Sequence, residues 1–385
     1  MSKSCPAKRP STGNDLFTSL SIEIDTNFDS PKKTPQITNP PLSAAVSDQR
    51  LSPIAICAMG GLAIQFGMQP ILIQSYVNSG VSPATLISCQ EAAKLGLALF
   101  MLRRSGPEEF ESSTKGWNLA TSFRVAGLPA IIYAVQGYCF LIAYKNLDPV
   151  SFNVINQTKT LAAALFCFLL MGKRQSNVQL LALVLLLLAS LVIEGIIDLG
   201  AVVASQDFTN DSVDELEGNN IIDQDQNYSL GLTMILTGCL LSGLAGALAQ
   251  KSLQIMGGGR NSFLFTAELS LFSAGCLILS LVFTGDIVGV LQHGFFHDWT
   301  LKTLLPIFSQ AFGGVCIGLV TKHAGAVMKG FALVIGLVLT GLFQSIKKGE
   351  ALTLNELFGV ILVSIATTLH LRYPYKPSIS QIPNI

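Results

Sequence analysis

Residues 149–197 read PVSFNVINQTKTLAAALFCFLLMGKRQSNVQLLALVLLLLASLVIEGII, and this stretch decides the class of fold. It contains two long apolar runs that are separated by the basic pair Lys173-Arg174. A helix of roughly 20 apolar residues crosses a hydrocarbon core of about 30 Å, and its backbone polar groups are then bonded within the helix. The stretch therefore predicts two membrane-spanning helices joined by a short basic turn.

Composition extends this prediction to most of the chain. Hydrophobic residues make up 50% of the sequence, charged residues make up 12% and the mean hydropathy is +0.53, whereas about a quarter of the residues in a soluble domain are charged. The 24 Lys and Arg balance the 24 Asp and Glu, so the net charge indicates no nucleic-acid partner, and the lipid bilayer is the expected environment. We predict an all-α integral membrane protein with ten transmembrane helices, at residues 53–77, 83–102, 124–144, 149–172, 177–197, 229–251, 262–285, 302–322, 326–346 and 354–372.

The distribution of Lys and Arg predicts the orientation of these helices. With residues 1–52 as a disordered cytosolic tail, 17 Lys and Arg lie on the side of the tail and four lie on the opposite side. Loops rich in Lys and Arg stay in the cytosol. An even number of helices returns the second tail, residues 373–385, to the same side. Both termini are therefore expected to be cytosolic.

The predicted loop at 198–228 agrees with this orientation. It contains eight Asp or Glu, no Lys or Arg, and N-glycosylation sequons that begin at Asn210 and Asn227. A sequon has a use only on the lumenal side, where glycans are attached to surface loops. We expect an acidic lumenal loop in which Asn227 lies close to the bilayer.

This loop divides the chain into halves with a common plan, residues 53–197 and 229–372. In each half the fourth predicted helix carries an intramembrane lysine, Lys159 or Lys329, and a basic pair follows that helix. Because each half has five helices, the second half enters the membrane from the opposite side. We therefore predict two inverted five-helix repeats, an architecture that places a substrate site near the membrane midplane between the halves.

The intramembrane lysines mark the candidate site, because a lysine at a helix centre costs roughly 3 kcal/mol on insertion scales. Asn153, Asn156 and Gln157 occupy a polar sector of the predicted helix, and Lys159 borders that sector. A polar, cationic stripe that faces a cavity suits an anionic ligand with hydrogen-bonding groups. Lys329, in the other half, is placed to contact the same ligand if its anionic group is a phosphate. The alternative is that the Lys329 side chain extends to the cytosolic interface of the membrane.

Three further features have both a structural and a functional interpretation. Glu91 and Lys94 lie three residues apart on one helix face, where they either neutralise each other or take part in coupling. Glu268 is interpreted as an unpaired acid, which leaves a substrate contact, a proton site and a buried carboxylic acid open. Gly243 and Gly330 are small residues that let helices approach closely, and sliding between the halves is the functional extension.

No catalytic constellation is evident in the sequence. GxSxG and HExxH patterns are missing, and no phosphate-binding glycine loop follows a predicted strand. Most of the cysteines fall within apolar runs without metal-type spacing, and His293 and His297 lie in a predicted loop. We expect no enzymatic activity, no catalytic residue, no cofactor and no metal site.

The stretch 129–192 resembles the signature of the nucleotide-sugar transporter family, within the drug/metabolite transporter superfamily. The shared positions in the first half include Pro129, Tyr133, Gln136, Asn146, Leu147, Asp148, Val154, Gln157, Lys159, Gly172 and Ser176. The block GGVCIGLVTKHAGAVMKGF at 313–331 looks like the second-half motif of the family through Gly313, Gly314, Lys322, Lys329, Gly330 and Phe331. With Glu91 to Lys94 and Ser242-Gly243, the resemblance covers residues 55–373.

The resemblance implies a carrier that exchanges a cytosolic nucleotide sugar for a lumenal nucleoside monophosphate by alternating access. The expected location is the Golgi membrane, with the endoplasmic reticulum membrane as the alternative. Lys159 and Lys329 match the phosphate-facing lysines of the family. The residues expected to contact the base or sugar are Asn153, Asn156, Gln157, Gln136, Tyr133, Gln69 and Glu268.

The stretches around Gln69 and Glu268 limit the range of expected substrates. They look nearest to the branch of the family that carries UDP-N-acetylglucosamine, CMP-sialic acid and UDP-galactose. The sequence departs from the family at Gly137-Tyr138, where two asparagines are common, so the base and sugar contacts are expected to differ. UDP-N-acetylglucosamine or a related UDP-sugar is the expected substrate. The alternatives are a carrier of the CMP-sialic acid type, a carrier of another small metabolite and a non-transporting membrane scaffold, and a homodimer is left open.

Overall fold

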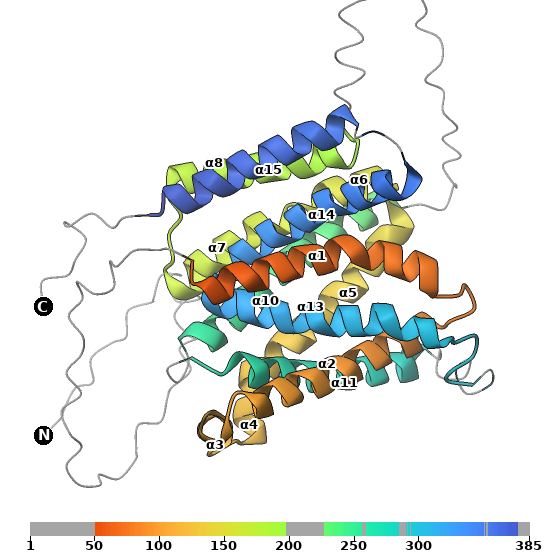
Figure 1. The fold of residues 1–385 in the computed structure, drawn as a ribbon, viewed down its shortest axis with the longest axis vertical. Coiled ribbons are helices and arrows are strands. Elements are labelled where there is room, and N and C mark those ends of the chain that lie inside the picture. Colours follow the sequence, from red (N-terminus) through yellow and green to blue (C-terminus); the bar gives the residue numbers. More distant parts are fainter. Residues whose placement is uncertain are drawn as a thin grey trace, which may run out of the picture. The chain divides into compact units, whose positions relative to one another are not determined.

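Helices joined by turns and irregular connections make up the described part of the chain (Figure 1). The computed structural model describes residues 51–197, 227–255, 259–284, 290, 292, 294–349, 351 and 353–375, and none of these forms a strand. The helices are α1 Pro53–Tyr76, α2 Pro83–Arg104, α3 Pro107–Thr114, α4 Leu119–Ser122, η2 Phe123–Gly127, α5 Leu128–Asn146, α6 Pro149–Asn156, α7 Lys159–Met171, α8 Asn177–Ile193, α10 Tyr228–Gln254, α11 Ser262–Thr284, η4 Leu301–Thr303, α13 Leu304–His323, α14 Ala326–Lys348 and α15 Leu354–Arg372.

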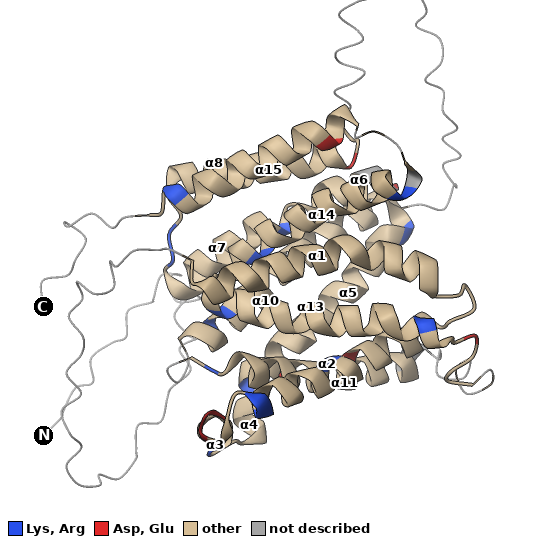
Figure 2. Cartoon of the chain, in the orientation of Figure 1, with Lys and Arg blue, Asp and Glu red and all other residues tan. Residues whose placement is uncertain are grey.

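Nine helical segments in the described residues are long and apolar enough to cross a membrane, and they correspond to nine of the ten predicted helices. The tenth corresponds to α8, a shorter apolar helix of 17 residues. Large apolar side chains also cover the outside of the helices, where Phe100, Leu169 and Phe308 expose 58%, 61% and 60% of their surface. Charged residues lie mainly near helix ends (Figure 2). This distribution suits a surface in contact with lipid.

The helix predicted at 149–172 is interrupted. α6 ends at Asn156, α7 begins at Lys159, and the backbone tightens between them. The amide of Thr158 donates to the carbonyl of Ile155 at 3.0 Å, a 3-10-type bond, and the Thr158 hydroxyl donates to the same carbonyl at 2.7 Å. A short 3-10 turn inside a helix often marks a hinge. Lys159 lies directly after this turn.

Local signals explain the turn between α7 and α8. Gly172 ends α7 with a φ of +67°, in the left-handed region that favours glycine. Ser176 then caps α8, because its hydroxyl accepts from the amide of Gln179 at 3.1 Å and the Gln179 side chain accepts from the Ser176 amide at 3.0 Å. The basic pair at 173–174 is thereby held between two helix ends.

Helices from the two halves of the sequence pack against each other. α1 packs against α13 and α14, and α10 packs against α5 and α7. α2 pairs with α11, α8 pairs with α15, and α7 contacts α14. The largest group of buried residues draws on α1, α7, α8, α13, α14 and α15, and includes the buried side chains of Leu62, Leu183 and Phe331. The fold therefore depends on contacts between segments that are far apart in the sequence.

Gly243 is expected to be intolerant of a side chain, because α10 lies against the backbone of α7 at this position. A Cβ added at Gly243 would lie 2.5 Å from the carbonyl carbon of Ala162 and 2.7 Å from the nitrogen of Ala163. We predict that Gly243→Ala lowers the stability by about 1–3 kcal/mol, because the backbone of α7 has to shift. The measurement is the apparent melting temperature of the purified protein. Gly96→Ala on α2 is the matched control, since a Cβ there meets nothing within 4 Å; equal melting temperatures for the two variants would contradict the prediction.

Candidate functional site

Lys329 lies in the first turn of α14, close to α5 and α10. Its Nζ is 5.9 Å from the centroid of the Tyr133 ring, a cation–π contact with α5. Gly246 of α10 faces both residues, because a Cβ added there would lie 3.8 Å from Lys329 Nζ and 3.9 Å from Tyr133 Oη. The missing side chain at Gly246 therefore leaves space beside the ammonium group and the phenol.

Lys159 lies near Lys329 because α7 and α14 touch at the next residue of each helix. A Cβ added at Gly330 would lie 2.6 Å from Thr160 Cγ2 and 2.8 Å from Thr160 Oγ1. The charges of Lys159 and Lys329 act on each other electrostatically. The Nζ of Lys159 also donates to Oδ1 of Asn156 at 3.5 Å. The two lysines that the sequence assigns to different halves are thus brought together.

Neither Lys159 nor Lys329 forms an ion pair with a residue that the structure describes. Both side chains are only partly exposed, and like charges in such a setting repel more strongly than in water. An anion with several oxygens would relieve this repulsion and accept hydrogen bonds from both ammonium groups. The arrangement is therefore chemically suited to a phosphate or diphosphate group.

Tyr133 and Gln136 lie three residues apart on α5 and share a face of that helix. Oε1 of Gln136 is buried, and no described residue bonds to it. Asn153 on α6 is partly buried as well. An orphaned buried acceptor needs an explanation, and a donor on a ligand or a water molecule would provide one.

Glu194 belongs to this region and was missed by the sequence analysis. Its Oε1 accepts from Nε2 of Gln157 at 3.0 Å, and its carboxylate acts electrostatically on Lys159. The other carboxylate oxygen is buried without a partner in the described part of the chain. The signal was available, because Glu194 is the only acid inside the span predicted at 177–197.

Glu91 and Lys94 form an ion pair at 2.7 Å on α2. In this geometry the two charges neutralise each other. The stem of Lys94 passes directly over Gly314 of α13. The second oxygen of Glu91 is buried, and among the described residues it has no partner. A role of this pair in coupling stays a prediction.

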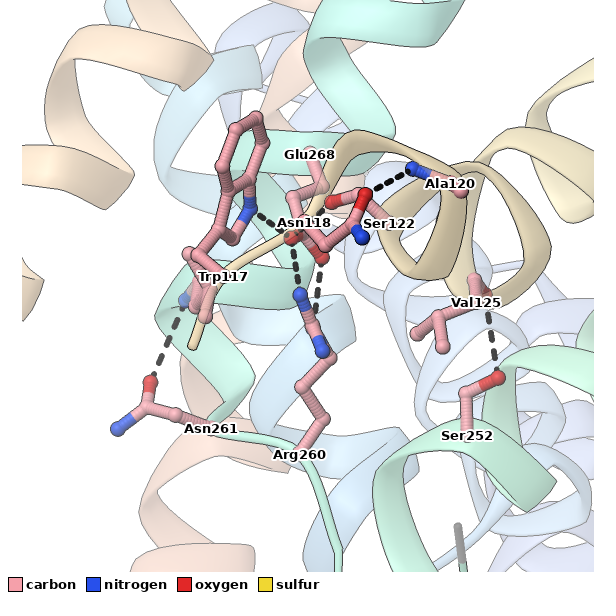
Figure 3. A network of polar contacts seen from close by, with 10 residues as sticks. Trp117, Asn118, Ala120, Ser122, Val125, Ser252, Arg260, Asn261 and Glu268 are labelled. Carbon is pink, nitrogen blue, oxygen red and sulfur yellow. Dashed lines mark hydrogen bonds and ion pairs between the residues drawn. The ribbon is translucent and has the colours of Figure 1, made fainter. Parts of the chain in front are cut away.

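Glu268 is not an unpaired acid, and that expectation is wrong. The Nε of Arg260 donates to Oε2 of Glu268 at 2.7 Å, and a terminal nitrogen of Arg260 donates to Oε1. Trp117 Nε1 donates to Oε1 at 2.8 Å, and the hydroxyl of Ser122 donates to the same oxygen (Figure 3). Sequence inspection misses the partner because Arg260 precedes Glu268 by eight residues and lies outside the helix.

The bonds around Glu268 link the connection between α2 and α5 to the start of α11. Asn261 Nδ2 donates to Oε1 of Glu109 on α3 at 2.7 Å, and the hydroxyl of Ser252 on α10 donates to the carbonyl of Val125 at 3.1 Å. The carboxylate of Glu268 is therefore engaged in holding these segments together. Its contact with a sugar stays a prediction.

Gln69 is also engaged within the protein. Its Nε2 donates to the carbonyl of Pro306 at 3.0 Å, and its Oε1 accepts from Gln65 at 3.2 Å. Gln65 donates further to Gln310 at 3.2 Å. These bonds connect α1 to α13, and contact of Gln69 with a substrate stays a prediction.

The two sequons differ in what the structure describes. Asn227 caps α10, because its Oδ1 accepts from the backbone amide of Leu230 at 3.1 Å. The backbone amide of Asn227 donates to Oδ1 of Asn146 at 3.1 Å. Asn210 lies outside the described residues. The use of either sequon stays a prediction.

Nine helical segments of membrane length in the described residues define a multi-pass membrane protein, in which two lysines lie on touching helices. The model of the nucleotide-sugar transporter family matches residues 84–371. The chain belongs to the nucleotide-sugar transporter family. The resemblance seen in the sequence is thereby confirmed, as is the expectation that the protein is a transporter rather than an enzyme.

Three curated proteins illustrate the relationship. The chain is 33% identical to a UDP-N-acetylglucosamine transporter of Arabidopsis thaliana over 314 residues, which cover 82% of this chain and 90% of the relative. It is 30% identical to a UDP-galactose transporter of Schizosaccharomyces pombe, with coverage of 69% and 67%. It is 27% identical to a UDP-N-acetylglucosamine/UDP-N-acetylgalactosamine transporter of Caenorhabditis elegans, with coverage of 76% and 84%.

A solved structure shows that the fold itself has precedent. A crystal structure of a protein with 11% sequence identity superposes with a TM-score of 0.57. The match covers 83% of this chain and 99% of the other chain.

Proposed function

We propose that the chain exchanges a cytosolic UDP-sugar, with UDP-N-acetylglucosamine as the best candidate, for a lumenal nucleoside monophosphate by alternating access. The observation that carries the proposal is the juxtaposition of Lys159 and Lys329 without an ion-pair partner in the described residues. In this mechanism the two lysines bind the phosphate oxygens. The residues proposed to contact the base or sugar are Tyr133, Gln136, Asn153, Asn156 and Gln157.

The choice of a UDP-sugar is supported by the relatives, three of which are described as transporters of UDP-N-acetylglucosamine, UDP-galactose or UDP-N-acetylgalactosamine. At sequence identities of 27–33%, relatives can differ in the nucleotide base that they recognise. A carrier of the CMP-sialic acid type would keep the same phosphate contacts and change those near Gln136 and Asn153. The choice between the two is therefore an outcome of the binding test below.

We further propose that α8 spans the membrane as a tenth helix and that the helices form two inverted five-helix repeats. The proposal is supported by the pattern of packing. An inverted repeat relates each of the first five spans to the span five positions later, so that α1 corresponds to α10, α5 to α13 and α7 to α14. Under this correspondence the packing of α10 on α5 is equivalent to that of α1 on α13, and the packing of α10 on α7 is equivalent to that of α1 on α14. The pairs α2 with α11, α7 with α14 and α8 with α15 map onto themselves. Lys159 and Lys329 then lie on symmetry-related helices.

Obligatory exchange follows from the charge of the site. Without a bound phosphate, Lys159 and Lys329 repel each other in a partly buried position, which disfavours the closed state that the carrier must pass through. Either the nucleotide sugar or the monophosphate relieves this repulsion, so both cross the membrane more readily than the empty carrier returns. The 3-10 turn before Lys159 is the proposed hinge.

The membrane and orientation are also proposals. We place both termini in the cytosol and residues 198–228 in the lumen, with glycosylation at Asn210, because Lys and Arg are concentrated on the side of the termini. The Golgi membrane is proposed as the location, with the endoplasmic reticulum as the alternative. Glycosidase treatment tests the orientation: loss of mass that Asn210→Gln abolishes supports it, and a glycan on an introduced cytosolic sequon would contradict it.

A binding assay tests the proposed substrate class directly. A ligand that binds only the folded state raises its stability in proportion to the logarithm of ligand concentration. We expect UMP and UDP-N-acetylglucosamine to raise the apparent melting temperature of the purified protein, with smaller effects of CMP, GMP and AMP. A larger effect of CMP would indicate the CMP-sialic acid type. No effect of any nucleotide on folded protein would overturn the proposal.

A further inference from the structure

A cavity of about 580 Å³ lies at the ends of α7, α8, α10, α14 and α15. Its lining includes Lys173, Arg174, Gln175 and His370, while Lys159, Lys329 and Tyr133 do not line it. Cavities that hold small molecules commonly have volumes of roughly 300–1,000 Å³. The size is therefore sufficient for a small organic ligand or for the head group of a lipid.

The charge of this cavity is positive on one side. Lys173 and Arg174 contribute two cations, and no Asp or Glu is among the residues that line it. The Nζ of Lys173 donates to Oε1 of Gln254 at 2.5 Å, and the guanidinium carbon of Arg174 lies 5.7 Å from the centroid of the Phe168 ring. Both residues are exposed, and neither contact neutralises the charge. In the described part of the chain neither forms an ion pair.

Two buried polar atoms on residues that line the cavity have no hydrogen-bond partner among the described residues. His370 is 6% exposed, and its Nδ1 forms no hydrogen bond with any described residue. Oε1 of Gln175 is buried and equally without a partner within the described ranges. Leaving a buried polar group unsatisfied costs about 1–3 kcal/mol, so such atoms are usually explained by a ligand or a water molecule. The side-chain Nε2 of Gln179 donates to the backbone carbonyl of His370 at 3.2 Å, and the imidazole packs against the Phe331 ring with the centroids 4.7 Å apart.

We propose that this cavity is a second binding site, separate from the transport site, for a ligand that carries a phosphate group and hydroxyl or amine donors. The phosphate binds Lys173 and Arg174, and no carboxylate among the lining residues opposes it. A donor of the ligand bonds to Oε1 of Gln175, and His370 bonds to a further polar group. Met328 and Leu371 give the cavity apolar walls. The same chemistry is available from a phospholipid head group and from a free phosphate compound.

The experiment measures the apparent melting temperature of the full chain in detergent against two probes, inorganic phosphate and dioctanoyl phosphatidic acid. We expect at least one probe to stabilise the protein at saturating concentration, and the Lys173→Gln/Arg174→Gln variant to weaken its apparent affinity at least about tenfold. Gln175→Leu removes an acceptor without changing charge and is expected to weaken the binding of the lipid probe. Arg372→Gln is the matched control, because it removes a cation at the exposed end of α15 outside the cavity.

The outcomes separate the two sources of phosphate. Stabilisation by inorganic phosphate assigns the site to a soluble compound, and stabilisation by the lipid alone assigns it to a head group. Binding that is unchanged in both cavity variants, or that is lost in Lys159→Ala, would overturn a separate site. If the double variant does not fold, the binding of the lipid probe to Gln175→Leu is the deciding measurement: weaker binding supports the second site, and unchanged binding contradicts it. Because the probes are not nucleotide sugars, failure of the proposed transport activity leaves this result intact.

Discussion

Lys159→Ala is expected to reduce uptake of the nucleotide sugar at least about 30-fold, and Lys329→Ala is expected to do the same. Truncating one partner of a buried, charge-assisted contact typically costs 2–5 kcal/mol, and 2 kcal/mol corresponds to a factor of about 30 in affinity. The two lysines lie on helices that touch at Thr160 and Gly330, and this proximity is the reason why both are proposed to hold the same phosphate group. The measurement is the initial rate of uptake into proteoliposomes.

The stability of the ligand-free variants distinguishes this role from a structural one. Removing one of two repelling cations is expected to leave the melting temperature unchanged or to raise it, since neither Lys159 nor Lys329 has an ion-pair partner in the part of the chain that the structure describes. Lys145→Ala, at an exposed position, is the matched control for uptake. Loss of uptake together with a large fall in melting temperature would instead assign the lysines to folding.

Glu268→Ala is expected to destabilise the protein by about 3–5 kcal/mol. The side chain is 4% exposed and receives hydrogen bonds from Arg260, Trp117 and Ser122. Its removal leaves the partly buried guanidinium of Arg260 without its partner, and breaking a buried ion pair from one side has a cost of this size. The apparent melting temperature of the purified protein measures the effect.

A double-mutant cycle separates the ion pair from the rest of the cluster. Glu268→Met combined with Arg260→Met is expected to be less destabilised than Glu268→Met alone, because no buried charge is left unpaired. Additive effects of the two substitutions would contradict the ion pair as the source of stability. If Glu268→Gln keeps the melting temperature of the parent protein but changes which sugar is transported, Glu268 contacts substrate as the sequence first indicated.

The positions of the helices follow from the sequence because lipid imposes a simple rule. A spanning segment must be long, apolar and internally hydrogen-bonded, and each of the ten predicted spans corresponds to a described helix or pair of helices. Lys159 and Lys329 were identified for the same reason, since an intramembrane charge is costly enough to require an explanation. The structure adds that the two residues lie on touching helices, which no periodicity within a single helix reveals.

Several side-chain partners and one local break in a helix are not evident from the sequence pattern. Arg260, the ion-pair partner of Glu268, lies outside the helix that carries Glu268. Gln69 bonds to Gln65 on its own helix and to Pro306, which is about 240 residues away in the sequence. Glu194 is the single acid of its apolar run, but that pattern does not reveal its hydrogen bond with Gln157 or its electrostatic interaction with Lys159. The break before Lys159 was also missed, because the sequence around it has no proline or glycine to interrupt a helix.

The most direct test of the central claim is an exchange measurement with the purified protein in liposomes that are preloaded with UMP, with CMP or with no nucleotide. We predict uptake of labelled UDP-N-acetylglucosamine or a related UDP-sugar that internal UMP stimulates and that Lys159→Ala abolishes. Uptake that is unaffected by removing the internal nucleotide would contradict the exchange mechanism. No uptake of any nucleotide sugar by folded protein would contradict the assignment of Lys159 and Lys329 to a transport site.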